Sequence, residues 1–332
     1  MSRSKKPPLL VGIEGGGTKT TCLVVGPDGS LRGAGSGGPS NVLVVGKDRA
    51  RESIQAAVRG ATDGRGLGEE TPVVCLGAAG VGSPEGKRMM KEVLRELHLS
   101  DRCVVVHDGV ISLMGATGGN LGIIIAAGTG SICFGMNSSG RFARSSGWGY
   151  VLGDEGSGYD IAKRGMTAAL RAHDLRGRPT ALEQKLVKHL GLSSIEDLVK
   201  VVYVDAMPRD KVSALAPLVL EAAREGDAVA IDILSHAGTE LGLAVVAVAR
   251  QLEMIGDDFD VATDGSIIEG FGHFVIDSLR SVVLESAPHA KMTHAKFKPV
   301  VGAVMIAAKE AGIGADESFL KRLEMDTRGL EL

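Results

Sequence analysis

Apolar residues recur with strand and helix periods in the first part of the chain. The runs "LLVGIE" and "TCLVVG" flank three consecutive glycines and predict two strands joined by a glycine turn, and "SLRGAG" predicts a third strand. Apolar residues then recur at helical spacing from Lys47 to Gly60. The chain is therefore predicted to begin with three strands followed by a helix.

The alternation of strands and helices continues to residue 117. "PVVCLGAAG" is typical of a buried strand, residues 84–99 of an amphipathic helix, "RCVVVHD" of another strand and residues 109–117 of a short helix. The first part of the chain is thus predicted as β-β-β-α-β-α-β-α, an α/β fold.

A second glycine hairpin opens the next part of the chain. Residues 121–137 again place an apolar strand, a Gly-Thr-Gly turn and an apolar strand in succession, which indicates an internal duplication. Residues 155–253 have helical patterns and predict a helical insertion, after which strands and helices alternate up to residue 312. We expect two domains, residues 1–118 and 119–332, whose glycine hairpins face each other across a cleft.

Length, charge and cysteines narrow the class of protein. The 332 residues are enough for two domains with their own cores, and a net charge of −3 gives no footprint for nucleic acid or an anionic membrane. Four cysteines, all single and in apolar runs, predict buried reduced thiols. Without a signal-peptide pattern or any span approaching a transmembrane helix, we expect a soluble cytoplasmic protein.

The two glycine turns are candidates for phosphate binding. The first fits neither a Walker A loop, since Thr18 separates Gly17 from Lys19, nor a dinucleotide fingerprint, since a strand follows it. Glycines let backbone N–H groups approach phosphate oxygens, although a tight hairpin without a ligand is the simpler alternative. The candidate phosphate-binding residues are Gly15, Gly16, Gly17, Thr18 and Lys19 in the first turn and Gly128, Thr129 and Gly130 in the second.

Two carboxylates follow predicted strands. Asp108 lies at the carboxyl end of a strand, where ligands bind in open α/β sheets, but an Asp before a helix is equally a good N-cap. Glu14 precedes the first glycine turn and could hold Mg²⁺ through water, or simply bond to local backbone.

The only tryptophan lies in a loop with features of a sugar site. Trp148 stands between Gly147 and Gly149, and Asp154 follows. An indole face suits the apolar side of a pyranose, glycines allow close approach and a carboxylate suits sugar hydroxyls. A lone Trp is ordinarily a core residue, however, and Asp154 could cap a helix.

Five motifs occur in a characteristic order: "IEGGGTKT", "HDG", "AAGTGS", "GWGYVLGDEGS" and "TDGS". This order resembles the N-acetylglucosamine kinase branch of the BadF/BadG/BcrA/BcrD ATPase family, over roughly residues 9 to 312. The family lies in the superfamily of actin, sugar kinases and heat-shock ATPases. The resemblance implies two actin-like (ribonuclease H-like) domains, ATP and Mg²⁺ as cofactors, a small sugar as substrate and often a homodimer.

The resemblance also implies roles for individual residues. Asp108 would accept the proton of the sugar hydroxyl, and Glu14, where many relatives carry aspartate, would be the Mg²⁺ ligand. The residues implied to contact the acetamido sugar are Gly147, Trp148, Gly149 and Asp154, with Asn41 from the other domain. Gly265 and Ser266 would lie under the adenosine, beside Asp264, where family members commonly have a glycine.

The expected function is an ATP-dependent kinase for the 6-hydroxyl of N-acetylglucosamine or a close amino sugar. Glucosamine, N-acetylmuramic acid and glucose are alternative acceptors between which the sequence does not choose. On the same fold, a BadF-type ATPase would need closely placed cysteine ligands for an iron–sulfur cluster. A sugar-responsive regulator is a third alternative.

Overall fold

The computed structural model describes residues 8–64, 67, 72–120 and 122–330. The chain forms two compact units, the first made of Met1–Asn120 together with Ala295–Leu332 and the second of Leu121–His294. The two units are described separately below.

The first unit is built on a five-stranded sheet with the order β3-β2-β1-β4-β5. Its strands are β1 (Leu10–Gly15), β2 (Thr20–Val25), β3 (Leu31–Gly37), β4 (Val73–Ala78) and β5 (Arg102–His107). β1, β2 and β3 form an antiparallel meander, and β4 and β5 extend it in parallel with β1. The carboxyl ends of β1, β4 and β5 therefore meet at one edge of the sheet.

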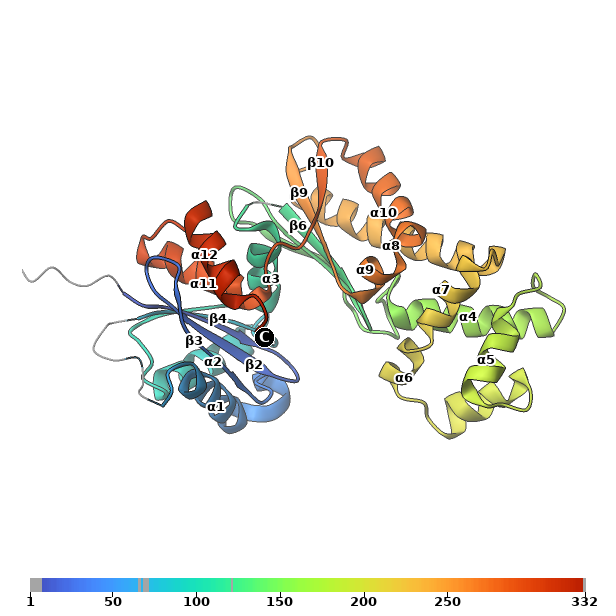
Figure 1. Ribbon diagram of the computed structural model, residues 1–332, viewed down its shortest axis with the longest axis horizontal. Coiled ribbons are helices and arrows are strands. Elements are labelled where there is room, and N and C mark those ends of the chain that lie inside the picture. Colours follow the sequence, from blue (N-terminus) through green and yellow to red (C-terminus); the bar gives the residue numbers. More distant parts are fainter. Residues whose placement is uncertain (1–7, 65–66, 68–71, 121, 331–332) are drawn as a thin grey trace, which may run out of the picture. The chain divides into compact units, whose positions relative to one another are not determined.

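Helices cover both faces of this sheet (Figure 1). Alternate residues of β1 point to opposite faces, so that Val11 and Ile13 pack with α1 (Val42–Ala61) and α2 (Pro84–Glu96). Leu10 packs on the other face with α3 (Asp108–Thr117), α11 (Pro299–Ala311) and α12 (Glu317–Thr327). Helix α11 approaches β1 closely because Gly12 has no side chain, and a Cβ there would lie 2.8 Å from the carbonyl oxygen of Val300.

The second unit repeats the same sheet topology, with the order β10-β9-β6-β7-β8. Its strands are β6 (Gly122–Ala127), β7 (Ser131–Met136), β8 (Phe142–Ser146), β9 (Phe259–Asp264) and β10 (Ala290–His294). β6, β7 and β8 again form an antiparallel meander, with β9 and β10 parallel to β6. This one-to-one correspondence confirms the duplicated α/β fold expected from the sequence.

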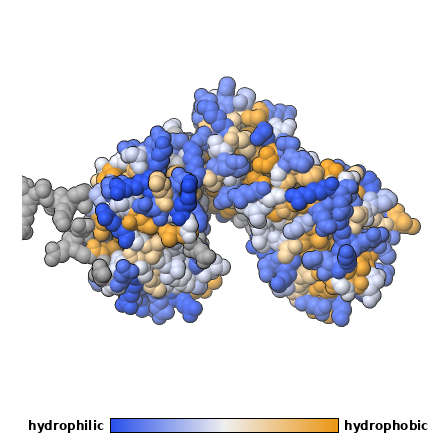
Figure 2. Space-filling view, in the orientation of Figure 1, coloured by the Kyte–Doolittle hydropathy of each residue, from blue (hydrophilic) through white to orange (hydrophobic). Residues whose placement is uncertain are grey.

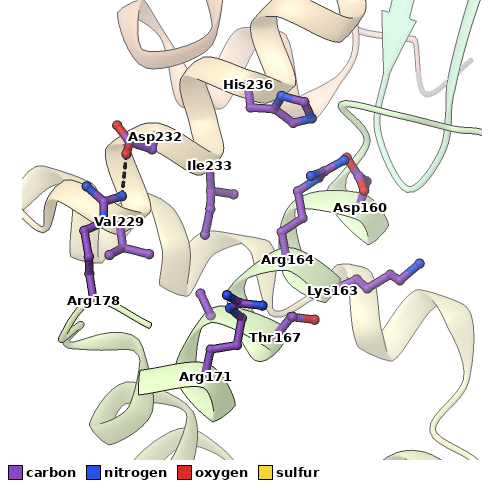
Figure 3. A pocket seen from close by; sticks show the side chains of 11 residues that line it. Asp160, Lys163, Arg164, Thr167, Arg171, Arg178, Val229, Asp232, Ile233 and His236 are labelled. Atoms are coloured by element: carbon purple, nitrogen blue, oxygen red, sulfur yellow. Dashed lines mark hydrogen bonds and ion pairs between the residues drawn. The ribbon is translucent and has the colours of Figure 1, made fainter. Parts of the chain in front are cut away.

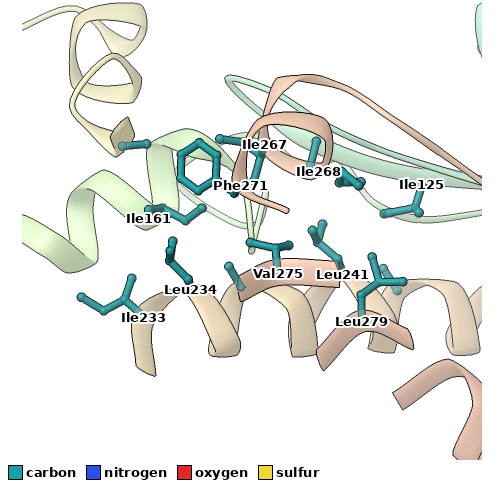
Figure 4. Close-up of a cluster of buried hydrophobic side chains, with 14 of the residues drawn as sticks. Ile125, Ile161, Ile233, Leu234, Leu241, Ile267, Ile268, Phe271, Val275 and Leu279 are labelled. Carbon is teal, nitrogen blue, oxygen red and sulfur yellow. The ribbon is translucent and has the colours of Figure 1, made fainter. Parts of the chain in front are cut away.

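The helical insertion lies between β8 and β9. It contains α4 (Gly158–His173), α5 (Leu182–Leu190), a 3₁₀ turn (Ile195–Asp197), a π-helical turn (Lys200–Val204), α6 (Arg209–Ser213), α7 (Ala216–Arg224) and α8 (Ala228–Gln251). After β9 follow α9 (Ser266–Phe271) and α10 (His273–Ser286). Figure 4 shows isoleucine, leucine and phenylalanine side chains of α4, α8, α9 and α10 meeting in one apolar cluster. In the face shown in Figure 2, hydrophilic residues cover much of the surface of each unit.

Two features differ from the sequence expectations. The predicted second domain, residues 119–332, includes α11 and α12, but these helices pack on the sheet of the first unit. An apolar helix pattern indicates burial without indicating which of two similar sheets it covers. In addition, α8 is long and apolar enough to cross a membrane, with 24 residues and a mean hydropathy of 1.4 over an 18-residue window, although no span was expected to approach that. In that window 61% is buried, and α8 packs along α10 through Gly238 and Gly242 as a core helix.

Candidate functional site

The first glycine turn connects β1 to β2 with a bare backbone. The amide of Gly16 donates to the carbonyl of Lys19 at 2.9 Å, which closes the turn. None of the three glycines has a positive φ, so conformation alone does not require them. Packing requires Gly15, where a Cβ would lie 2.7 Å from Oγ of Ser40, but a Cβ on Gly17 would meet no atom within 4 Å. The missing side chain at Gly17 thus leaves open space at the tip of the hairpin.

A buried hydroxyl pair ties the loop before α1 to this hairpin. Oγ1 of Thr20 lies 2.7 Å from the carbonyl oxygen of Gly38 and 2.8 Å from Oγ of Ser40. The amide of Ser40 donates to the carbonyl of Gly16 at 3.0 Å. The next residue, Asn41, is thereby held near the turn. Its Oδ1 accepts from the amide of Leu43 at 3.3 Å and caps α1.

Asp108 lies where β5 passes into α3, as the sequence predicted. The N-cap of α3 is His107, not Asp108, because Nδ1 of His107 accepts from the amide of Gly109 at 3.0 Å. Oδ1 of Asp108 accepts from the same amide at 2.8 Å and lies 2.8 Å from Nδ1 of His107. The amide of Gly109 is thus shared by two acceptors, Nδ1 of His107 and Oδ1 of Asp108. The Asp108 side chain remains 40% exposed.

Glu14, at the end of β1, belongs to the same group of charges. Burial raises the pKa of its carboxyl above the ordinary value, and the negative charge of Asp108 raises it further. The charges of Lys19 and Lys298 and a hydrogen bond from the amide of Val300, in the first turn of α11, oppose that rise in pKa. The edge of the first sheet therefore combines two carboxylates, two lysines and the glycine turn. We call these residues, Glu14 to Lys19, Asp108 and Lys298, the first-unit cluster.

The second glycine turn, between β6 and β7, is anchored to α4. The amide of Gly128 donates to the carbonyl of Gly130, and the amide of Gly158 at the start of α4 donates to the carbonyl of Gly128, both at 2.8 Å. Thr129 is exposed at the tip. A Cβ on Gly130 would lie 2.8 Å from Oδ2 of Asp154. The turn and the acidic loop therefore adjoin each other.

Asp154 is a buried carboxylate with two partners. Its side chain is 5% exposed; Oδ2 accepts from Nη2 of Arg209 at 2.7 Å and Oδ1 from the amide of Gly149 at 3.2 Å. Asp154 itself has a positive φ of 59°. Arg209 also lies 5.5 Å from the ring of Tyr150. Sequence reasoning missed Arg209, because no local motif pairs it with a carboxylate 55 residues earlier, and it missed His107 as the cap and partner of Asp108.

Trp148 is a surface residue and not a core residue. Its side chain is 64% exposed, and the guanidinium of Arg144, from β8, lies 4.1 Å from its ring centroid. Positive φ angles of 72° at Gly147 and 88° at Gly149 form the bends on either side of it. The indole thus keeps one face against Arg144 within a loop that Asp154 fixes through Gly149.

The predicted adenosine-side loop lies beside the second turn. Gly265 has a φ of 97°, and a Cβ there would collide with the backbone of Ala127 at the end of β6. Ser266 begins α9, and its Oγ is 3.8 Å from the position of a Cβ on Gly128. Asp264 accepts a hydrogen bond from the amide of Gly265 at 2.8 Å. We call Gly128 to Gly130, Gly147 to Gly149, Asp154, Arg209, Gly265 and Ser266 the second-unit cluster.

The cysteines lie outside both clusters and are free thiols. Cys22, Cys75 and Cys133 are buried as expected, whereas Cys103 is only half-buried. Burial raises the pKa of the Cys22 and Cys75 thiols to about 12. These thiols are therefore protonated at neutral pH and poor metal ligands. Within the described ranges, no group of three or more His, Cys, Asp or Glu side chains is arranged to hold a metal ion.

Comparison with known proteins gives consistent matches over nearly the whole chain. The profile of the BadF/BadG/BcrA/BcrD ATPase family matches residues 11–307. An N-acetylmuramic acid/N-acetylglucosamine kinase of Clostridium acetobutylicum is 35% identical over 307 residues, 91% of this chain and 98% of that protein. An N-acetyl-D-glucosamine kinase of Dictyostelium discoideum is 32% identical over 311 residues, 90% of this chain and 97% of that protein.

A solved structure has the same fold. It is a candidate N-acetylglucosamine kinase of Chromobacterium violaceum, with 25% sequence identity and a TM-score of 0.67. The match covers 91% of this chain and 99% of that one.

Proposed function

Because the chain belongs to the BadF/BadG/BcrA/BcrD ATPase family, we propose that it is an amino-sugar kinase that transfers the γ-phosphate of ATP to the 6-hydroxyl of N-acetylglucosamine or a close relative. The observation that carries the proposal is the placement of Asp108. Its carboxylate stands exposed at the carboxyl end of β5, in the same group of charges as the first glycine turn. Phosphoryl transfer needs little beyond such positioned charges, phosphate cradles and an oriented hydroxyl.

Asp108 accepts the proton of the attacking hydroxyl in this proposal. Its Oδ1 accepts from the amide of Gly109, which fixes the carboxylate, while its exposure leaves room for the sugar. General-base catalysis of this kind contributes about 10²–10⁴-fold to the rate.

The two glycine turns bind the phosphates of ATP. At Gly16 and Gly17 the backbone N–H groups can approach phosphate oxygens because no side chain intervenes, and Thr18 and Lys19 add a hydroxyl and a positive charge. Gly128, Thr129 and Gly130 form the second cradle, and Gly265 and Ser266 lie beside it for the adenosine. A donor of this kind implies a cytoplasmic site of action.

The donor set at Glu14 fits Mg²⁺. Mg²⁺ keeps several waters and takes one or two carboxylates plus phosphate oxygens, and Glu14 with Asp108 supplies two carboxylates near one sheet edge. A cation there would offset the burial and the negative charge of Asp108, which together raise the pKa of Glu14. The chemistry that Mg²⁺ supplies when bound is neutralisation of charge on the β- and γ-phosphates.

The loop around Trp148 binds the sugar. The exposed indole offers an apolar surface, Gly147 and Gly149 allow close approach of the backbone, and Asp154 fixes the loop through Gly149 while keeping lone pairs for a sugar hydroxyl. Asn41 uses Oδ1 to cap α1, so its amide nitrogen is the group that donates to the acetyl carbonyl.

A coupled assay of ADP release tests this proposal. ATP and Mg²⁺ are supplied with N-acetylglucosamine, glucosamine, N-acetylmuramic acid or glucose, alongside a control without sugar. We expect turnover that depends on an amino sugar, with phosphorus at the 6-position by NMR. ADP release that no sugar stimulates would contradict the proposed reaction.

A further inference from the structure

A cationic groove lies within the second unit between α4 and α8, apart from the residues proposed for catalysis. Its volume is about 490 Å³, within the range of small-molecule sites. Figure 3 shows α4 carrying Arg164 and Arg171 and α8 carrying Ile233 and His236. The lining residues are Asp160, Lys163, Arg164, Thr167, Ala168, Arg171, Arg178, Val229, Asp232, Ile233 and His236.

The charges of this groove do not balance. Four cationic side chains face two carboxylates, and each carboxylate is already paired: Nε of Arg164 lies 2.9 Å from Asp160, and Arg178 bonds to Asp232. Among the residues that the structure describes, Lys163 and Arg171 have no acidic partner within ion-pair distance. The groove therefore carries an excess of two positive charges.

His236 adds an unused polar atom. Its Nε2 is buried and makes no hydrogen bond within the described part of the chain, with Oε1 of Glu240 3.6 Å away. Figure 3 shows the imidazole on the same side of the groove as Arg164, while Arg171 lies between Arg164 and Arg178 in this view. Three guanidinium groups and an imidazole thus surround one open volume.

We infer that this groove binds a phosphate monoester. Guanidinium forks match phosphate oxygens, and a dianion offsets the excess of two charges. The apolar side chains of Val229 and Ile233 on α8 and Ala168 on α4 provide a surface for the carbon body of a phosphorylated small molecule. This site does not depend on the proposed reaction.

Binding of an anion in the groove would also affect the loop that follows Trp148, because Asp160 contacts both. Oδ2 of Asp160 accepts from Nε of Arg164 at 2.9 Å and from the amide of Gly156 at 3.2 Å. An anion that draws Arg164 away changes the partners of the carboxylate that holds Gly156. The groove is therefore connected to the acidic loop by a single shared side chain.

Calorimetric titration of the full chain with inorganic phosphate and with glucose 6-phosphate tests the site. We expect binding that weakens at least about fivefold in Arg171→Gln and in Arg178→Gln, the loss of roughly one charge-assisted contact. Arg250→Gln is the matched control, because Arg250 is exposed on α8 and lies about 21 Å along the helix from His236. Binding of both probes indicates recognition of phosphate alone, and binding of the sugar phosphate alone indicates a phosphorylated sugar; both support the site.

The variant Asp232→Asn is expected to bind phosphate more tightly than the parent protein does. It frees Arg178 and removes a negative charge with little change of shape, so binding should tighten. Unchanged affinity in all three groove variants would overturn the inference, as would the absence of measurable binding at millimolar phosphate. Equal affinity for citrate would overturn the assignment to phosphate monoesters.

Discussion

Arg209, the first residue of α6, donates a 2.7 Å hydrogen bond to Asp154, a buried carboxylate 55 residues earlier in the chain. This pair joins the helical insertion to the loop that contains Trp148. Since Asp154 is 5% exposed and Arg209 39% exposed, solvent screens the interaction only in part.

Arg209→Ala is expected to destabilise the protein by about 1–3 kcal/mol, because it leaves a buried carboxylate without its charged partner. Urea denaturation measures this free energy of unfolding. The control is Arg141→Ala, whose partner Glu253 is 80% exposed and whose loss should cost no more than about 1 kcal/mol. An equal loss of unfolding free energy in both variants would show that the buried pair stabilises the protein no more than the exposed pair does.

Asp108→Asn should lower the turnover of the sugar kinase by about 10²–10⁴-fold while leaving the melting temperature nearly unchanged. The helix keeps its cap in this variant because His107 still accepts from the amide of Gly109. Steady-state kinetics and thermal unfolding on the same preparation separate the two effects. Asp258→Asn, at an exposed position directly before β9, is the control for a lost carboxylate. Turnover within a factor of two of the parent would remove Asp108 from the proposed mechanism.

Gly17→Ala should raise the KM for ATP without lowering stability. A Cβ there meets no protein atom within 4 Å, so the folded chain tolerates it, but it occupies the space proposed for phosphate oxygens. Gly314→Ala is the matched control, because Gly314 also has open space around its Cβ position and lies in the connection between α11 and α12. If the two variants have the same KM for ATP, the first turn does not bind the nucleotide.

Glu14→Gln should increase stability at neutral pH and decrease activity. The pKa of Glu14 is raised above its ordinary value of 4.5, so the folded chain binds this proton more tightly than the unfolded chain. The contribution of Glu14 to the free energy of unfolding therefore falls as pH rises from the unfolded pKa through the folded pKa. Melting temperatures of parent and variant should differ more at pH 7 than at pH 4. A difference independent of pH would contradict the raised pKa.

Trp148 provides an optical test of the sugar site, because it is the only tryptophan in the chain. Its 64% exposed indole should change fluorescence intensity when an amino sugar binds. Trp148→Phe should lose that signal and raise the KM for the sugar, with little loss of stability because the ring is not in the core. Addition of a saturating amino sugar without any spectral change would contradict contact with Trp148.

Much of the fold could be predicted because its determinants are local. Alternating apolar runs on both sides of "GGGTKT" and "GTG" specify two hairpins, and their repetition specifies the duplication. The partner of α11 could not be predicted, since Val300 and Val304 indicate burial against some sheet without indicating which.

The residues of the candidate site were likewise predictable only where local sequence places them. Asp108 and the glycine turns follow from their positions at strand ends, whereas the pairing of Arg209 with Asp154 depends on how α6 returns to the loop, which no short pattern records. Helix capping by His107 was also unexpected, because Asp is the stronger N-cap by preference and stands next to it.

The return of residues 299–311 to the first sheet has a consequence for biosynthesis. Leu10, Leu23 and Cys75 are made before the second unit, yet the helix that covers them is completed only after the whole second unit has been translated. A nascent chain that stops before Pro299 would expose that apolar face to its neighbours in the cell. Premature termination shortly before Pro299 should therefore yield insoluble protein, even though both glycine turns and Asp108 have already been synthesised.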